Sequence, residues 1–232
     1  MKVLDNKIPL TRIQKLIGKL MQQSKHQMPC FYLESKTDLT NLGKTRKSYC
    51  KAIGTRVTTN DFFYCAIARA INQFPLMAGK MDKGGKHIQI AEKIGIGFAV
   101  AAPQGLVVPV IQDSGEKSLD RIATESSELL KKARANKLMP YDFDGANVVL
   151  SALGMYGINS FLAIVPPGAT GIISIGTINN TVVHVDDKMA IRKTMSVALA
   201  ANRKIVDEFY AAKFLTSVVD QLENPATLTG QF

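Results

Sequence analysis

The chain has 232 residues, of which 46% are hydrophobic, and a formal net charge of +10. This length suits a single domain over residues 1–232 with a substantial buried core. No apolar run approaches the roughly eighteen residues of a membrane span, and the N-terminal sequence MKVLDNKIPL lacks the apolar segment of a signal peptide. These features exclude a membrane protein and predict one that is soluble in the cytoplasm, or in an organelle matrix if the source is eukaryotic.

Cysteine and charge patterns exclude several classes of site. Cys30, Cys50 and Cys65 are odd in number and lack CxxC or Cys/His spacing, which argues against a disulfide framework and a zinc site. The 29 Lys and Arg residues are scattered, often on helix faces. We therefore expect a solvated basic surface and no nucleic-acid ligand. The alternative is attraction of an acidic partner or a phosphorylated ligand.

The N-terminal third predicts two helices around a strand. Thr11 is placed to cap a helix whose apolar residues must face a core or a neighbouring subunit. Pro29 ends that helix, and residues 30–36 alternate as a strand. Residues 58–61 offer several capping side chains before an apolar helix over residues 62–74. The apolar stripe of the first helix is Ile13, Leu16, Ile17, Leu20 and Met21.

Buried strands dominate the middle of the chain. Gly84-Gly85 predicts a hairpin turn before a strand at residues 87–91. Two apolar runs, 94–102 and 106–111, then predict two buried strands, with Pro109 indicating a sheet edge or a bulge.

A helix and another strand follow these runs. Ser118 is placed to cap a helix whose apolar residues recur at helical spacing to Ala133. A strand at residues 147–150 brings Ser151 to the edge of a glycine-bearing turn at 154–157.

The last third predicts a hairpin, a long strand and a helix. Runs at 171–178 and 181–185 predict a hairpin across Asn179-Asn180, residues that tolerate positive φ. After a turn at 186–188 comes a strand over 189–201. In the final helix, residues 205–222, one face carries Ile205, Phe209, Ala212, Thr216 and Val219, with Val206 and Phe214 beside it.

Several of these segments together resemble one family. The pattern IGxxVAxPxGLxVPVI at residues 96–111, KSL at 117–119 and SxLGMYG at 151–157 are similar to the catalytic core of the dihydrolipoamide acyltransferases of 2-oxoacid dehydrogenase complexes. Similarity extends through IPLTRIQKLIGKLMQQSK, TTNDF and AAKFL to LENP, which covers nearly the whole chain.

The resemblance implies an α+β fold, a two-layer α/β sandwich of the coenzyme A-dependent acyltransferase type shared with chloramphenicol acetyltransferases. The sheet is expected to be mixed, with helices on one face, and the building unit is expected to be a trimer. Family members also carry lipoyl and subunit-binding domains before the core, and we expect neither domain, and no lipoyl lysine, in this chain. The family's cage contacts use an apolar C-terminal tail, whereas this chain ends in ATLTGQF, which argues against a closed cage.

The family transfers an acyl group between the thiols of dihydrolipoamide and coenzyme A, at a site between subunits. A general base must accept a thiol proton, and a hydrogen-bond donor must stabilise the oxyanion. The resemblance assigns the donor to Ser151. Without the resemblance, a serine at a strand end is more often a routine cap or turn residue.

The base is missing from its expected place. The family's DHRxxDG motif aligns without a gap and puts Arg203 on the catalytic histidine and Asp207 on the later aspartate. A guanidinium stays charged throughout the physiological pH range and only donates hydrogen bonds, so it cannot accept the proton. Three further positions depart from the motif, with Asn202 for Asp, Lys204 for Arg and Glu208 for Gly. Glu208 removes the backbone freedom that a glycine has.

Three hypotheses follow. The first is an impaired or inactive core that acts as a trimeric scaffold or as the non-catalytic partner of an active core or of other complex components. The second is an active acyltransferase with an altered base or acceptor, for which His26 and Cys30 are the outside candidates. The third is a small-molecule binder that keeps the coenzyme A channel. We expect weak coenzyme A binding and no metal.

Overall fold

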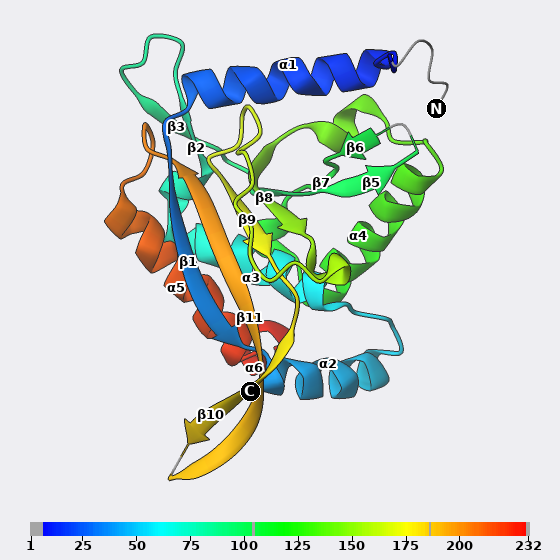
Figure 1. Cartoon of the computed structure of the whole chain (residues 1–232), viewed down its shortest axis with the longest axis vertical. Helices are drawn as coiled ribbons and strands as arrows, with labels where there is room; N and C mark the ends of the chain where they lie inside the picture. Colours follow the sequence, from blue (N-terminus) through cyan, green and yellow to red (C-terminus); the bar gives the residue numbers. More distant parts are fainter. Residues whose placement is uncertain (1–6, 104, 186, 231–232) are drawn as a thin grey trace.

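The computed structural model describes residues 7–103, 105–185 and 187–230. A twisted mixed sheet in the order β1-β11-β9-β8-β4-β7 forms its centre (Figure 1). The strands are β1 (Cys30–Asp38), β2 (Gly79–Met81), β3 (Ile88–Ile90), β4 (Gly95–Phe98), β5 (Val100–Ala102), β6 (Gly105–Val107), β7 (Val110–Ile111), β8 (Ala146–Ala152), β9 (Gly171–Ile175), β10 (Asn179–Val185) and β11 (Lys188–Asn202). The α-helices are α1 (Arg12–Gln27), α2 (Thr40–Ile53), α3 (Thr59–Gln73), α4 (Leu119–Arg134), α5 (Glu208–Glu223) and α6 (Ala226–Thr229).

The two faces of the sheet are covered differently. Alternation along β8 sends Val148 and Leu150 into the main core, which α3, α4 and α5 cover. Val149 points to the opposite face, where it packs in a small cluster with Val165, Ala169, Ile172 and Ala200. β8 is parallel to β4 and β9, while the other sheet pairs are antiparallel. The predicted mixed sheet is therefore confirmed, with the main helical layer on one face.

Helix α3 begins at the capping sequence identified above. Thr58 is the N-cap, and its hydroxyl accepts a hydrogen bond from the Asp61 backbone N–H while the Asp61 carboxylate accepts one from the Thr58 N–H at 2.7 Å. The other Asp61 oxygen accepts a hydrogen bond from the Ser126 hydroxyl of α4 at 2.6 Å. Asp61 is thus a buried capping residue that joins two helices.

Replacing Asp61 should destabilise the fold without touching the candidate site. Asp61→Ala removes a cap and leaves the Thr58 N–H and the Ser126 hydroxyl without their acceptor, so we expect a loss of about 2–4 kcal/mol in the free energy of unfolding. Urea denaturation measures it. Asp61→Asn keeps an acceptor and should lose less, and Glu128→Ala on the exposed side of α4 should change little; equal losses for all three would contradict this role.

The structure corrects the predicted hairpin at residues 171–185. β9 ends at Ile175 and pairs with β8 and β11, whereas β10 pairs only with the first half of β11, in register from Asn179↔Thr194 to Val185↔Lys188. The prediction across Asn179-Asn180 was wrong because β11 has 15 residues and can pair with β10 and β9 in succession along its length. The real hairpin turn includes Asp187 at φ 58°, while Asp186 lies outside the described residues.

The predicted face of the last helix is also wrong. α5 begins at Glu208, so Ile205 and Val206 precede it. Phe209, Ala212 and Thr216 face outward, and of the predicted stripe within the helix only Val219 is buried. The core face consists of Ala211, Phe214, Leu215, Val218, Val219 and Leu222.

The two apolar runs in the middle of the chain are each divided. Residues 94–102 form β4 and β5, and residues 106–111 contribute to β6 and β7, so the β5–β6 hairpin projects as a separate ribbon. Gln104, between these strands in the sequence, lies outside the described residues. Pro109 lies just before β7, the edge strand of the main sheet, as the proline predicted.

Candidate functional site

Ser151 lies near the end of β8, on the sheet face opposite the main helical layer. It is in register with Ser174 of β9, which in turn pairs with Ala198 of β11. The side chain of Ser151 is partly exposed, whereas Ser174 is buried. A serine hydroxyl at this strand end can donate a hydrogen bond to a ligand that lies against the sheet face.

Close backbone packing fixes the turn that follows Ser151. A Cβ on Gly154 would overlap the carbonyl oxygen of Gly176, and a Cβ on Gly176 would overlap that of Asn159. The chain after β8 therefore folds tightly against the end of β9, and only glycine allows this approach. Leu153 adds a backbone hydrogen bond to Ile175. Ser151 consequently projects from a rigid support.

Arg203 follows β11 and is paired with Glu208, another residue that departs from the motif. Its Nε atom donates a hydrogen bond to Glu208 Oε1 at 2.9 Å, and its backbone N–H donates to the carbonyl oxygen of Pro29. Both side chains are about half exposed, at 52% and 55%. From the sequence we predicted only a loss of backbone freedom at Glu208. The signal for this ion pair was that Arg203 and Glu208 carry opposite charges and lie five residues apart, across a turn at the start of a helix.

Two neighbouring polar residues have structural contacts. Asp207 is the N-cap of α5, and its carboxylate accepts a hydrogen bond from the Tyr210 N–H at 2.8 Å. Buried Asn202 accepts one from the Lys204 N–H at 3.1 Å. Both side chains therefore order the turn that carries Arg203.

Ser151 and Arg203 lie toward opposite ends of the sheet within one chain. Ser151 is level with Ala198 across two strand pairings, and Arg203 follows Ala198 by five residues, which corresponds to roughly 17 Å along the strand direction. One copy of the chain therefore does not bring these side chains together.

Cys30 is the register partner of Asn202 and borders a cavity of about 170 Å³. Partial burial raises the pKa of its thiol, with Lys25 acting weakly in the other direction. The thiol is thus kept protonated, which disfavours nucleophilic attack. The cavity is lined by Ser24, Lys25, Met28, Pro29, Cys30, Tyr32, Ile164 and Val165.

The three histidines lie on separate elements. His26 is exposed in the last turn of α1, and His87 contacts Asp82 at 3.0 Å in the β2–β3 hairpin. His184 is exposed on β10, opposite Met189 of β11. The side chain of His184 has no hydrogen bond to another described residue.

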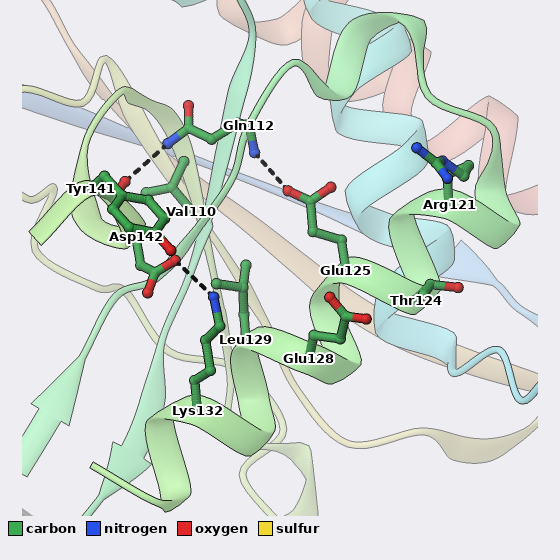
Figure 2. Close-up of a pocket in the computed structure, with 10 residues that line it drawn as sticks. All are labelled: Val110, Gln112, Arg121, Thr124, Glu125, Glu128, Leu129, Lys132, Tyr141 and Asp142. Carbon is green, nitrogen blue, oxygen red and sulfur yellow. Dashed lines mark hydrogen bonds and ion pairs between the residues drawn. The ribbon is translucent and has the colours of Figure 1, made fainter. Parts of the chain in front are cut away.

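A larger cavity, of about 360 Å³, lies between α4, β7 and the short helix η3 (Pro140–Phe143) (Figure 2). Lys132 pairs with buried Asp142 at 3.4 Å, and Gln112 donates its backbone N–H to Glu125 at 3.3 Å. Neither Ser151 nor Arg203 lines it. Because neither of these two residues contributes to its lining, this cavity is separate from the predicted site.

Within the described part of the chain, residues 7–103, 105–185 and 187–230, no three His, Cys, Asp or Glu side chains are grouped to hold a metal ion. None of the helices in this part has the length and apolarity needed to cross a membrane.

Residues 3–229 match the family described as 2-oxoacid dehydrogenases acyltransferase (catalytic domain). The chain belongs to this family. It is similar to the dihydrolipoyllysine-residue acetyltransferase component of the pyruvate dehydrogenase complex of Rickettsia felis, with 33% identity over 95% of this chain and 54% of that protein. It is also 31% identical to the mitochondrial pyruvate dehydrogenase protein X component of Mus musculus, over 95% of this chain and 44% of that protein. The chain thus spans about half the length of these relatives.

Solved structures confirm the predicted fold. The Azotobacter vinelandii dihydrolipoamide acetyltransferase superimposes with a TM-score of 0.90 at 26% identity, covering 96% of this chain and 93% of that one. That structure comes from work on a serine, a histidine and an asparagine in the enzyme's catalytic mechanism. A chloramphenicol acetyltransferase shares the fold, with a TM-score of 0.55 at 16% identity over 88% of this chain and 94% of that one.

Proposed function

We propose that this chain is an acyltransferase core with little or no catalytic activity of its own, which acts as a trimeric scaffold or as the non-catalytic partner of an active core. The observation that carries this proposal is the Arg203–Glu208 ion pair at the position aligned with the family's histidine. A fixed cation paired with a carboxylate cannot accept a thiol proton at neutral pH. An acetyl-transfer assay between dihydrolipoamide and coenzyme A tests it.

The remaining parts of the site support a chain that keeps the architecture of the family. Ser151 is held at a rigid strand end, as an oxyanion donor requires. Its distance from Arg203 along the sheet supports a site shared by two copies. The similarity to a protein X component as well as to an acetyltransferase fits either the scaffold or the partner role.

The second candidate is an active acyltransferase with a different base. Ser151 and the small cavity beside Cys30 favour it, since both could contact a substrate. Against it, burial raises the pKa of the Cys30 thiol. If the unmodified chain turns over at ordinary enzyme rates, His26→Ala and Cys30→Ala become the deciding variants.

We expect a trimer in solution, because the apolar stripe of α1 is only partly covered within one chain. Leu16 is 56% exposed, and Ile13 and Leu20 are also exposed. An obligate interface that covers them should bury more than about 2,000 Å². Sedimentation equilibrium should give three copies at micromolar concentration. Leu16→Glu should weaken the assembly, Lys15→Glu on the opposite side should have a smaller effect, and a stable wild-type monomer would rule the trimer out.

Coenzyme A should bind weakly as a substrate-like ligand. The net charge of +10 attracts a polyphosphate, and the sheet around Ser151 keeps the fold of the family. Titration calorimetry should show binding in the range of about 0.1–1 mM that weakens with added salt. Dephosphorylated coenzyme A, with fewer charges, should bind more weakly; absence of heat at millimolar ligand would refute the proposal.

A further inference from the structure

The outward face of α5 carries an exposed aromatic ring beside an open groove. Phe209 is 70% exposed, and it lines a groove of about 560 Å³ together with partly buried Phe74 at the end of α3. Exposed apolar surface next to a hollow commonly marks an interaction site. We call this hollow the α5 groove; its lining is Gln73, Phe74, Phe209, Ala212, Lys213, Thr216, Ser217, Asp220 and Gln221.

The side chains along the α5 groove have a definite order. The ring of Phe209 lies at one end, with the Lys213 ammonium 4.2 Å from its centroid, and Asp220 lies toward the other end. Between them are the small residues Ala212 and Thr216. Lys213 and Asp220 are about 10 Å apart along the helix, and neither forms an ion pair with another described residue.

We propose that the α5 groove binds α5 of a second copy of this chain, antiparallel across a two-fold axis. Such an interface repeats every contact twice. An axis beside Thr216 brings Lys213 of each copy opposite the partner's Asp220, and it places each Phe209 ring at the far end of the partner's groove. Ala212 and Thr216 are small enough for the helix axes to approach to about 8–10 Å.

Charge favours this orientation over others. The chain carries +10 overall, so two copies repel one another unless the surfaces that meet are locally balanced. The groove presents one cation and one anion, and the antiparallel arrangement pairs opposite charges, whereas a parallel one pairs like charges. A contact between two helices is smaller than a standard interface of about 1,600 Å², so each contact is weak and depends on concentration.

Sedimentation velocity of the full chain, from micromolar to near-millimolar concentration, tests this surface. The wild type should associate reversibly into species larger than the smallest species that the Phe209→Ser variant forms. Phe209→Ser should weaken this step at least about tenfold, because a buried aromatic anchor is lost. Lys213→Asp and Asp220→Lys should each weaken it several-fold by opposing like charges.

The double variant Lys213→Asp/Asp220→Lys provides the decisive control. It restores opposite charges across the axis, so its self-association should return toward the wild-type level. Lys131→Asp, on the exposed surface of α4, should leave the step unchanged. The proposal is overturned if the wild type shows no such step, if Phe209→Ser leaves it unchanged, or if the double variant recovers nothing. Far-UV circular dichroism confirms that each variant is folded, and the acyl-transfer activity of the chain does not enter the result.

Discussion

Acetyl transfer between dihydrolipoamide and coenzyme A should run about 10²–10⁴ times more slowly with this chain than with a family enzyme that has a histidine base. The reason is local to the turn after β11. The Arg203 guanidinium stays protonated at neutral pH and already donates to the Glu208 carboxylate, so the attacking thiol has no acceptor for its proton there.

Restoring the imidazole tests this explanation directly. Arg203→His with Glu208→Gly and Asn202→Asp should raise the rate by at least about tenfold, since it restores both the base and the residues that support it. The gain should grow as the pH rises through about 6–7, where an imidazole loses its proton. A thioester transfer assay with free dihydrolipoamide measures both effects.

Arg203→Ala is the matched control for that experiment. It removes the ion pair without supplying a base, so the rate should stay at the wild-type background. If the unmodified chain is as fast as an ordinary enzyme and Arg203→Ala leaves that rate intact, the base lies elsewhere and the proposed function is wrong.

Local sequence signals predicted most of the fold because they are set by nearby residues. The capping sequence at 58–61, the alternation of β1 and the edge position implied by Pro109 were all confirmed. Pairing partners were harder to predict. Asn179-Asn180 has the chemistry of a hairpin turn, yet the length of β11 decides that β10 pairs there and β9 pairs further along.

The prediction of which face of α5 is buried was wrong for a different physical reason. Phe209 is apolar and at helical spacing from Ala212 and Thr216, so the sequence assigns them to the core. The core side is instead set by Phe214 and Leu215, which pack against the sheet and α3. A helix with apolar residues on more than one side has no unique buried face in sequence alone.

The arrangement of the candidate site depends on where residues far apart in the sequence lie in the fold, and motif spacing does not reveal this. The ungapped motif alignment singled out Ser151 and Arg203, but nothing in the sequence says that they lie toward opposite ends of the sheet. Nor did it reveal that Asp207 caps α5, or that Arg203 and Glu208 pair with each other. These contacts show that one chain has a paired cation at the aligned base position and does not bring Ser151 and Arg203 together.

That separation leads to the second large expected effect, which is complementation between two inactive chains. One component is the unmodified chain, which keeps Ser151 but has no base. The other carries Ser151→Ala together with Arg203→His, Glu208→Gly and Asn202→Asp, so it has the imidazole but no donor. Losing an oxyanion donor typically costs about 10²–10³ in rate, so each assembly alone should be nearly inactive.

Co-assembly of the two chains should restore activity if each site takes Ser151 from one copy and the base from its neighbour. With equal amounts and random mixing, about a quarter of the sites combine Ser151 with the restored base. Each site takes one contribution from each of two copies, and each contribution has a one-half chance of coming from the chain that carries the functional residue. The reference is the variant with Arg203→His, Glu208→Gly and Asn202→Asp that keeps Ser151, assayed at the same total concentration. A mixture near one quarter of that reference supports the shared site. A mixture no faster than either component, while the reference is active, would mean that both halves come from one chain.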